Sequence, residues 1–270
     1  EMGVGVFSWC EMMTSADLVD ITLKELPAMT FALAGDEESG FTVTLSNTIT
    51  LLGEKCFYGS AIKELDLSAS GVNEIGNDAF ADCQYLSSVK LGKITALGDG
   101  AFAAKSSKEF KLAAVSFGEG SSVLGTNTFF GQKSLKEVKL SAEQEKLQEI
   151  GAGVFAYCTA LKSLPVKPVV AGDYAFAGCS ALTLDLSAIE RAGAGAFRGC
   201  KALTATLDKL EKAGDYAFAD CSARSDFQNA ANGRKKAAKA TDCPAPHPTR
   251  QSSARNGYSS RRIFRPRRPR

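Results

Sequence analysis

Phenylalanine recurs along the chain at a nearly fixed interval, each time with glycine four residues before it. The pairs are Gly53/Phe57, Gly76/Phe80, Gly98/Phe102, Gly125/Phe129, Gly151/Phe155, Gly172/Phe176, Gly193/Phe197 and Gly214/Phe218. The steps between these phenylalanines are 23, 22, 27, 26, 21, 21 and 21 residues. Gly3/Phe7 begins the same phrase, and Phe31 fits as a member without the glycine. This period, held over about ten units, predicts repeats that stack on one another.

The clearest units, such as 76–86 and 172–182, read Gly-x-x-Ala-Phe-x-x-Cys-x-x-Leu and continue into a short segment of alternating apolar and polar residues. The alternating segments are 86–91, 135–140 and 161–166, with shorter forms at 62–67 and 182–186. Alternation with a period of two predicts half-buried strands whose apolar side chains point inward. The glycine predicts a backbone bend that a Cβ would resist. The phenylalanines of stacked units are expected to form one continuous aromatic interior.

These phrases resemble the BspA-like leucine-rich repeat family, whose unit reads close to Leu-x-x-Ile-x-Leu-Pro…Ile-Gly-x-x-Ala-Phe-x-x-Cys. The resemblance covers residues 41–221 well and 1–40 loosely, and rests on pairs such as Ile75-Gly76 before the phenylalanine. It implies an α/β, β-dominated leucine-rich repeat solenoid of about ten coils over residues 1–221. Short strands would lie on one face, with turns and short helical pieces on the other. The family's association with cell-surface adhesion and protein binding implies a similar role.

Departures from the unit predict local changes. Lys105 and Ser107 stand where Cys and Leu are expected after Phe102, which predicts a looser coil. This unit and the next are longer than the others, which predicts longer loops near 118–122 and 142–146. Thinner coils are predicted where alanine replaces the large residue before glycine, at Ala171, Ala192 and Ala213.

Six of the eight cysteines stand three residues after the phenylalanine of their unit. They are Cys10, Cys83, Cys158, Cys179, Cys200 and Cys221. A straight row of single cysteines cannot surround a zinc ion, which prefers close pairs and four converging ligands. The main interpretation is a row of small buried thiols. A disulfide between neighbouring coils remains an alternative that requires converging Cβ vectors. Neither Cys56 nor Cys243 has an obvious partner.

The chain carries one histidine, His247, which lies outside the repeats. The repeats therefore lack the Ser-His-Asp and Cys-His arrangements of nucleophilic enzymes and the commonest transition-metal ligand. Carboxylates are expected at solvated strand and loop positions. The sequence predicts a non-enzymatic protein with no catalytic residue, metal site or cofactor.

A partner is expected to bind the concave face of the solenoid, where polar side chains alternate with the inward apolar ones. The predicted partner-binding residues are Lys63, Glu64, Asp66, Ser88, Lys90, Lys108, Glu109, Lys111, Lys136, Glu137, Lys139, Lys162, Thr183, Asp185, Thr204 and Thr206. The recurring Lys-Glu pairs suggest charge pairing between strands. A solvated sheet face is the plainer alternative. The expected ligand is a protein or a glycan. Few of the predicted binding positions are aromatic, so the sequence does not indicate a tight interface.

The net charge of +2 conceals two different segments. Residues 1–221 carry 19 Lys and Arg against 28 Asp and Glu, whereas residues 222–270 carry 13 against 2. The second segment also holds five of the eight prolines and few large apolar residues, which predicts a disordered basic tail. Nucleic-acid binding through this tail is a further hypothesis. An unfolded tail and an erroneous gene-model end are plainer ones.

The chain begins inside a repeat-like phrase, at residues 3–10, without the pattern of a signal peptide. We therefore expect a fragment. No run of 18 apolar residues predicts a membrane span. The family resemblance favours a cell-surface or extracellular location, and an intracellular leucine-rich repeat scaffold is the alternative. The sequence does not predict an oligomeric state.

Overall fold

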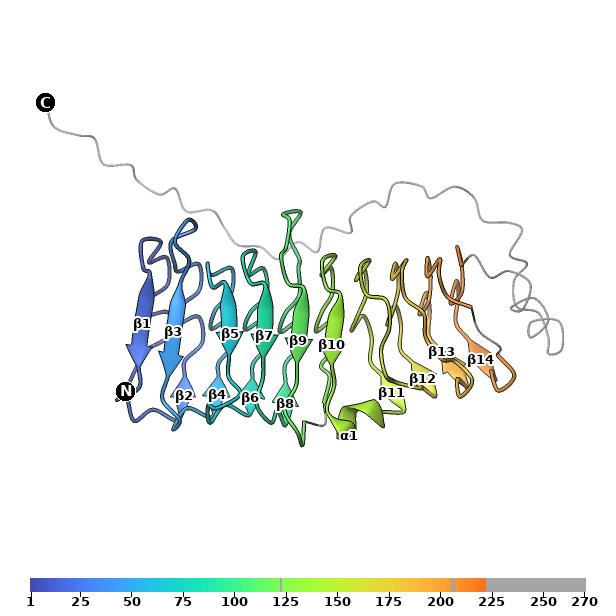
Figure 1. Ribbon diagram of the computed structural model, residues 1–270, viewed down its shortest axis with the longest axis horizontal. Helices are drawn as coiled ribbons and strands as arrows, with labels where there is room; N and C mark the ends of the chain where they lie inside the picture. Colours follow the sequence, from blue (N-terminus) through green and yellow to red (C-terminus); the bar gives the residue numbers. More distant parts are fainter. Residues whose placement is uncertain (122, 205–206, 222–270) are drawn as a thin grey trace, which may run out of the picture. The chain divides into compact units, whose positions relative to one another are not determined.

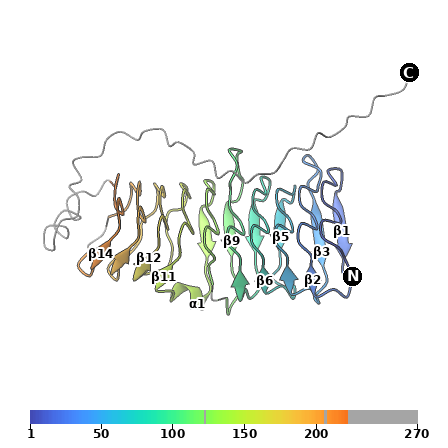
Figure 2. The same ribbon diagram turned by 180° about the vertical axis from the view of Figure 1, so that it is seen from behind.

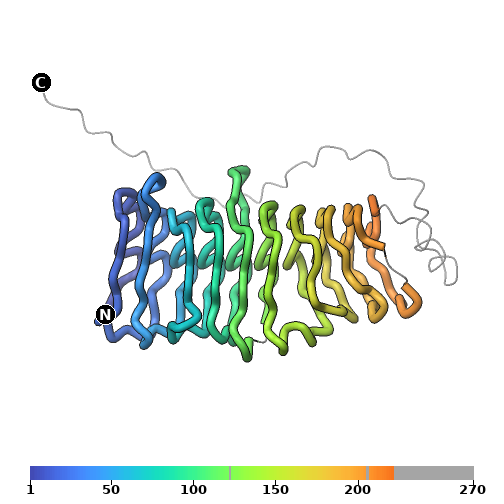
Figure 3. The backbone as a smooth tube through the Cα atoms, in the orientation of Figure 1, coloured from blue at the N-terminus to red at the C-terminus, as the bar shows by residue number. Residues whose placement is uncertain are grey.

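The computed structural model describes residues 1–121, 123–204 and 207–221, which form a stack of similar coils (Figures 1 and 3). Each repeat makes one turn of the stack, so residues one repeat apart lie side by side. The predicted β-dominated solenoid is confirmed. In this described part the only helix is α1, Ala142–Glu145, and no helix is long and apolar enough to cross a membrane. The predicted disordered tail, residues 222–270, lies outside the described residues.

A first set of parallel strands includes three of the predicted alternating segments, 62–67, 86–91 and 135–140. The strands of this set are β1 (Ser15–Leu18), β3 (Thr42–Leu45), β5 (Glu64–Asp66), β7 (Ser88–Lys90), β9 (Ala114–Ser116) and β10 (Glu137–Lys139). Strands β1 and β3 pair with each other, and the other four form one sheet in the order β10-β9-β7-β5. The central residue of each of these four strands is buried while its neighbours are more exposed, as the period of two predicts.

A second set of two-residue strands ends just before the repeat glycine, except that β2 ends before Pro27 and that no described strand precedes Gly125. These strands are β2 (Glu25–Leu26), β4 (Leu51–Leu52), β6 (Glu74–Ile75), β8 (Ala96–Leu97), β11 (Glu149–Ile150), β12 (Val170–Ala171), β13 (Arg191–Ala192) and β14 (Lys212–Ala213). They form two parallel sheets, β2-β4-β6-β8 and β11-β12-β13-β14. The expectation of strands on a single face was therefore incomplete (Figure 2). The predicted thinning of the last three coils stays a prediction.

The repeated phenylalanines fill the interior, as predicted. Ring centroids of successive members lie 5.0–5.8 Å apart and nearly parallel, from Phe7 through to Phe218. Phe31 takes its place in this stack, so the degenerate N-terminal unit keeps the repeat geometry. Phe102 is fully buried and 5.2 Å from Phe80, so the predicted loosening is not seen at the ring. Each stacked ring adds contacts to both of its neighbours.

The Gly-x-x-Ala-Phe phrase forms the third side of each coil, and its main chain bonds to the next coil. Phe57 N–H donates to the Ala79 carbonyl and Phe80 N–H to the Ala101 carbonyl, each at 2.8 Å. Two residues before and two after the phenylalanine, the chain adopts left-handed φ, as at Asp78 (55°), except at Ala104 after Phe102. Because left-handed φ is unfavourable for most residues, only tight packing between coils maintains this ladder.

The repeat glycine is required for a different reason from the predicted bend. Its φ is not left-handed. A Cβ built on Gly172 would lie 2.8 Å from the Ala152 nitrogen and 2.9 Å from the Gly151 carbonyl carbon, in the preceding coil. Gly76 meets the same obstacle 2.8 Å from the Glu54 nitrogen. Glycine is needed because two main chains approach closely here.

The in-phase cysteines are free thiols, and all but Cys10 are buried. Each buried one donates to the main-chain carbonyl of the phenylalanine in the preceding coil. The bonds are Cys83 to Phe57 (3.0 Å), Cys158 to Phe129 (3.1 Å), Cys179 to Phe155 (2.9 Å), Cys200 to Phe176 (3.0 Å) and Cys221 to Phe197 (3.1 Å). Gln132 does the same for Phe102 at 2.6 Å. The predicted row of buried thiols is confirmed, and each of these five thiols joins its coil to the one before it.

The two long units differ in where they hold their extra residues. Ala114 lies twelve positions after Phe102. Ser88, which pairs with Ala114, lies only eight positions after Phe80. Most of the extra length therefore precedes β9 and does not lie near 118–122, so that prediction was wrong. The second insertion does lie at 142–146, but it forms α1 and not a loop. Its N-cap, Ser141, makes a capping box with Gln144, a signal that the sequence carried.

Two predicted strands do not form. Segments 161–166 and 182–186 contain only an isolated bridge between Ser163 and Thr183. Pro165 has no N–H, so it cannot donate to a strand ladder. Pro165 lies as far after Phe155 as Lys139 lies after Phe129, so it corresponds to Lys139, which lies in β10.

Candidate partner-binding surface

The register of the first sheet arranges outward side chains in two columns. One column holds Glu64, Ser88, Ala114 and Glu137, and the other holds Asp66, Lys90, Ser116 and Lys139. Between them runs the buried row of Leu65, Val89, Val115 and Val138. We call the outward side of β5, β7, β9 and β10, together with the following segments 162–166 and 183–187, the strand face.

The strand face brings together most of the residues predicted to bind a partner. Glu64, Asp66, Ser88, Lys90, Glu137 and Lys139 lie in its strands. Lys63 and Lys136 directly precede a strand, and Lys162, Thr183 and Asp185 are exposed on the segments that follow β10. Thr204 is exposed one coil further on, and Thr206 lies outside the described residues. Whether a partner binds them stays a prediction.

Three predicted residues are not on the strand face. Lys108, Glu109 and Lys111 lie in the insertion before β9, because the extra residues shift the strand to 114–116. Lys111 instead places its ammonium group 5.1 Å from the centre of the Tyr85 ring, a cation–π contact. In β9, Ala114 holds the outward position that was predicted for Glu109, and Ser116 holds the one that was predicted for Lys111. The face therefore carries fewer charges at its centre than predicted.

Charges on the strand face pair differently from the expected Lys-Glu pattern. The cross-strand pair joins Lys90 to Asp66 at 3.3 Å, whereas Lys139 pairs with Glu137 of its own strand at 3.6 Å. The predicted charge pairing between strands therefore occurs at Lys90, although its partner there is an aspartate and not a glutamate. The Ser68 hydroxyl and N–H donate to Asp66 and, with Lys90, hold the pKa of this carboxyl below its usual value. Exposed pairs of this kind contribute little to stability.

The second half of the strand face carries one further ion pair. Lys167 and Asp185, from successive coils, lie 2.9 Å apart. The Ser187 hydroxyl and then Lys167 hold the pKa of Asp185 well below its usual value, so this group is a carboxylate at any physiological pH. Its negative charge is a fixed feature of the face.

The strand face is interrupted after β10. A hollow of about 400 Å³ separates this strand from the next coil and is lined by Lys136, Glu137, Val138, Lys139, Leu140, Glu145, Ser163 and Pro165. The sequence showed Pro165 inside a predicted strand, which was the available signal for this break. A polar surface hollow next to the edge of β10 that does not face β9 is a place where a ligand can reach main-chain groups.

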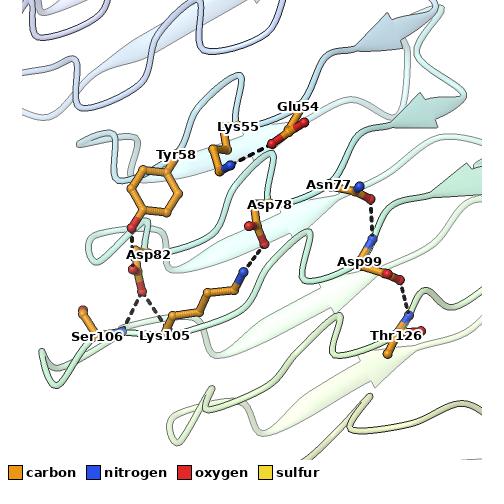
Figure 4. Close-up of polar contacts among 10 residues, drawn as sticks. All are labelled: Glu54, Lys55, Tyr58, Asn77, Asp78, Asp82, Asp99, Lys105, Ser106 and Thr126. Carbon is orange, nitrogen blue, oxygen red and sulfur yellow. Dashed lines mark hydrogen bonds and ion pairs between the residues drawn. The ribbon is translucent and has the colours of Figure 1, made fainter. Parts of the chain in front are cut away.

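Polar contacts on the third side of the coils serve structure (Figure 4). The Asn77 side-chain oxygen accepts the Asp99 N–H at 2.8 Å, and the Asp99 carboxylate accepts the Thr126 N–H at 3.2 Å. The Asp82 carboxylate accepts the N–H groups of Lys105 (2.7 Å) and Ser106 (3.0 Å). These side chains link neighbouring coils, so these carboxylates are engaged in holding the stack together.

Tyr58 and Lys105 complete this network. The Tyr58 hydroxyl donates to Asp82 at 3.1 Å, and burial together with the Asp82 charge raises the pKa of Tyr58. The Lys105 ammonium group forms an ion pair with Asp78. Over the described residues, no three His, Cys, Asp or Glu side chains are grouped so that they could hold a metal ion. His247 lies outside those residues.

Comparison with known proteins assigns the family. The family described as "BspA type Leucine rich repeat region" matches residues 1–116 and 107–225, in six copies. The chain belongs to the BspA-type leucine-rich repeat family. The Gly-x-x-Ala-Phe-x-x-Cys phrase of its BspA-type repeats thus corresponds to the third side of each coil, where glycine, phenylalanine and thiol all contact the neighbouring coil.

The solved structures that are similar to this BspA-type chain include three leucine-rich repeat proteins. A leucine-rich cell surface protein from Faecalibacterium prausnitzii is 21% identical, with a TM-score of 0.44 over 75% of this chain and 60% of that one. A leucine-rich repeat protein from Eubacterium ventriosum is 17% identical, with a TM-score of 0.43 over 78% of this chain and 77% of that one. Another, from Bacteroides ovatus, is 18% identical, with a TM-score of 0.38 over 82% of this chain and 79% of that one. The chain thus spans 60% of the Faecalibacterium protein. No curated protein sequence matches it.

Proposed function

We propose that this BspA-type chain is a non-enzymatic binding module whose protein or glycan partner binds the strand face. The observation that supports this proposal is the register of β5, β7, β9 and β10, which presents two columns of outward side chains at one-coil spacing. The columns combine carboxylates, ammonium groups and hydroxyls with the small Ala114. A partner that spans several coils would contact all of them at once.

The chemistry of the described residues favours binding over catalysis. The repeats contain no histidine. All thiols of the cysteine row except that of Cys10 are buried, and burial raises the pKa of Cys83 to about 12, so the Cys83 thiol is not a nucleophile at neutral pH. The carboxylates of the third side are engaged in links between coils. A rigid scaffold with an exposed polar face is suited to recognition.

The proposed place of action is the cell surface, which follows from the family's association with adhesion. An intracellular scaffold would use the same strand face, so location needs a separate measurement. Protease added to intact cells of the source organism should remove the chain if it is surface-exposed. Full protection until the cells are lysed would contradict the surface location without affecting the binding proposal.

The binding proposal is tested by charge reversal on the strand face of the full-length chain. Partners are first captured by crosslinking and identified by mass spectrometry. Lys90→Glu together with Lys139→Glu should reduce retention of a captured partner at least tenfold. The matched control is Lys24→Glu together with Lys212→Glu, which changes the net charge equally. Lys24 directly precedes β2 and Lys212 lies in β14, so both belong to the second set of strands and not to the strand face. Equal retention by both double variants would show that the strand face is not the binding surface.

A further inference from the structure

Strand β10 has an unpaired edge. The Glu137 N–H donates to the Ala113 carbonyl at 3.2 Å, and the Lys139 carbonyl accepts from the Phe117 N–H at 2.9 Å, so these two residues bond to the β9 side. In a parallel pair, alternate residues of a strand direct their N–H and C=O groups to opposite neighbours. The groups of Val138 therefore point to the other edge, toward the hollow.

No described residue bonds to the main-chain groups on this edge. The N–H groups of Val138 and Leu140 have no acceptor, and the carbonyls of Lys136 and Val138 have no donor, among the hydrogen bonds of the described chain. In β7, the corresponding Leu91 N–H donates to Ser116 of the next coil at 2.8 Å. The edge of β10 therefore offers two donors and two acceptors in alternation, directly at the hollow.

Two features of this chain keep the edge open. Pro165 occupies the position in the next coil whose N–H would donate to the Val138 carbonyl, and proline has none. Helix α1 also inserts extra residues between β10 and β11 (Figure 1). The other members of this sheet, β5, β7 and β9, are each followed by a paired strand.

We propose that the edge of β10 binds an extended polypeptide segment of the partner, which adds to the sheet as a further strand. A peptide main chain supplies alternating N–H and C=O groups at the spacing of a strand edge, whereas a glycan or a nucleic acid does not. The edge from Lys136 to Leu140 accommodates an extended segment of about 17 Å. Ser163 and Pro165 form the opposite wall of the hollow.

This inference rests on the proposed binding function and narrows the partner from a protein or glycan to a protein with an extended segment. The charges beside the edge are balanced, with Lys136 and Lys139 against Glu137 and Glu145. Main-chain bonds would therefore supply the affinity, and side-chain contacts along the strand face would supply the selectivity.

The free protein provides the first test. Amide exchange measured by NMR on the full chain should be fast at Val138 and Leu140 and at least tenfold slower at Glu137 and Lys139. Equal protection of all four amides would mean that the edge is already paired, which would overturn the proposal.

The second test uses synthetic heptapeptides enriched from a random display library on the full chain. An enriched peptide should protect the Val138 and Leu140 amides, and N-methylation of alternate peptide residues should weaken binding at least tenfold while the residues between tolerate it. Ser163→Trp, which fills the hollow, should weaken binding to the same extent, and Ser107→Trp, in the insertion before β9, should not. Failure to enrich a peptide, protection elsewhere, or uniform tolerance of N-methylation would overturn the proposal.

The two proposals can fail separately. If charge reversal at Lys90 and Lys139 abolishes retention of a captured partner while Ser163→Trp leaves it unchanged, the strand face is the binding surface and the peptide-strand inference is wrong. If neither change reduces retention, the strand face itself is not the site.

Discussion

Individual residues of the repeat act mainly on the neighbouring coil. The glycine provides room for the preceding main chain, and the cysteine thiol donates to the carbonyl of the preceding phenylalanine. The backbone conformation alone would not require glycine at this position, since its φ is not left-handed. The glycine and the cysteine both depend on the close spacing of coils, so both should be sensitive to local differences in that spacing.

Gly172→Ala and Gly151→Ala separate the steric role of glycine from its conformational freedom. An added Cβ at Gly172 meets main-chain atoms at 2.8 and 2.9 Å, whereas at Gly151 the nearest atom is a Val154 methyl at 3.7 Å. We expect Gly172→Ala to lower the free energy of unfolding by about 1–3 kcal/mol and Gly151→Ala to change it by at most about 0.5 kcal/mol. Urea denaturation followed by circular dichroism measures both. Equal effects would show that spacing between coils is not the cause.

The buried thiols predict a loss of stability at alkaline pH. Burial raises the pKa of Cys158, Cys179 and Cys200 far above the ordinary value of 9.0. Above pH 9 the unfolded chain loses these protons and the folded chain keeps them, so the stability contribution is present below pH 9 and falls as pH rises. The expected loss is about 1.4 kcal/mol per thiol for each pH unit above 9, until the folded-state pKa is reached.

Comparison with a triple alanine variant at these three cysteines isolates the effect. The free energy of unfolding should fall more between pH 8 and pH 10 in the natural chain than in the variant. Lysine and tyrosine titrate in both proteins, so their contribution cancels in this comparison. The same pH dependence in both proteins would contradict buried, protonated thiols.

Among the elements, α1 is stabilised by contacts with Gly120, Ser121 and Val123 of the preceding coil. Ser121, beside the turn at 118–120, accepts at its carbonyl from the Ser141 hydroxyl, and the Gln144 amide donates to the Val123 carbonyl at 2.8 Å. The Glu143 carboxylate accepts the Gly120 N–H at 3.2 Å. A four-residue helix is far too short to be stable alone. These contacts with the preceding coil explain why α1 forms at all.

Ser141→Ala should destabilise the chain because Ser141 both caps α1 and bonds to Ser121. The expected cost is about 1–2 kcal/mol. Ser107→Ala, an exposed position in the other insertion, is the control and should change stability by less than about 0.5 kcal/mol. Thermal unfolding by calorimetry measures the difference. No difference between the two variants would show that α1 does not contribute to stability.

For the described stack as a whole, the order of the sheets divides the coils into two blocks. The second set of strands pairs within β2–β8 and within β11–β14, and the first set ends at β10. Around Phe129 the coils are joined by the phenylalanine stack and the third-side ladder. In a repeat protein, stability is nearly a sum of local terms and neighbour contacts, so the weakest junction decides whether unfolding is cooperative.

Phe129→Ala should uncouple the two blocks, whereas Phe57→Ala, inside the first block, should lower stability without uncoupling them. Each truncation should cost about 3–5 kcal/mol. Hydrogen exchange with mass spectrometry at increasing urea compares segments 41–97 and 149–204. These segments should open at different urea concentrations only in Phe129→Ala. If they open together in both variants, the stack is one cooperative unit.

Much of the fold followed from residues whose pattern repeats. The phenylalanine stack, the inward row from Leu65 to Val138 and the row of thiols all come from a period that burial imposes on every coil, so each repeat supplies the same information again. The candidate surface was predicted less well. Lys108, Glu109 and Lys111 were misplaced because a 27-residue unit does not show where its extra residues lie, and only pairing between Ser88 and Ala114 fixes the register.

The sequence by itself determined that units stack, which side chains turn inward and that the repeats lack histidine chemistry, because these depend on periodicity and residue type. Tertiary structure alone decided which segments pair, where the ladder breaks and why glycine is required. Pairing depends on which main-chain groups of two coils meet at hydrogen-bond distance. A proline such as Pro165 removes one donor, but the open edge that it leaves belongs to β10, 26 residues earlier in the chain.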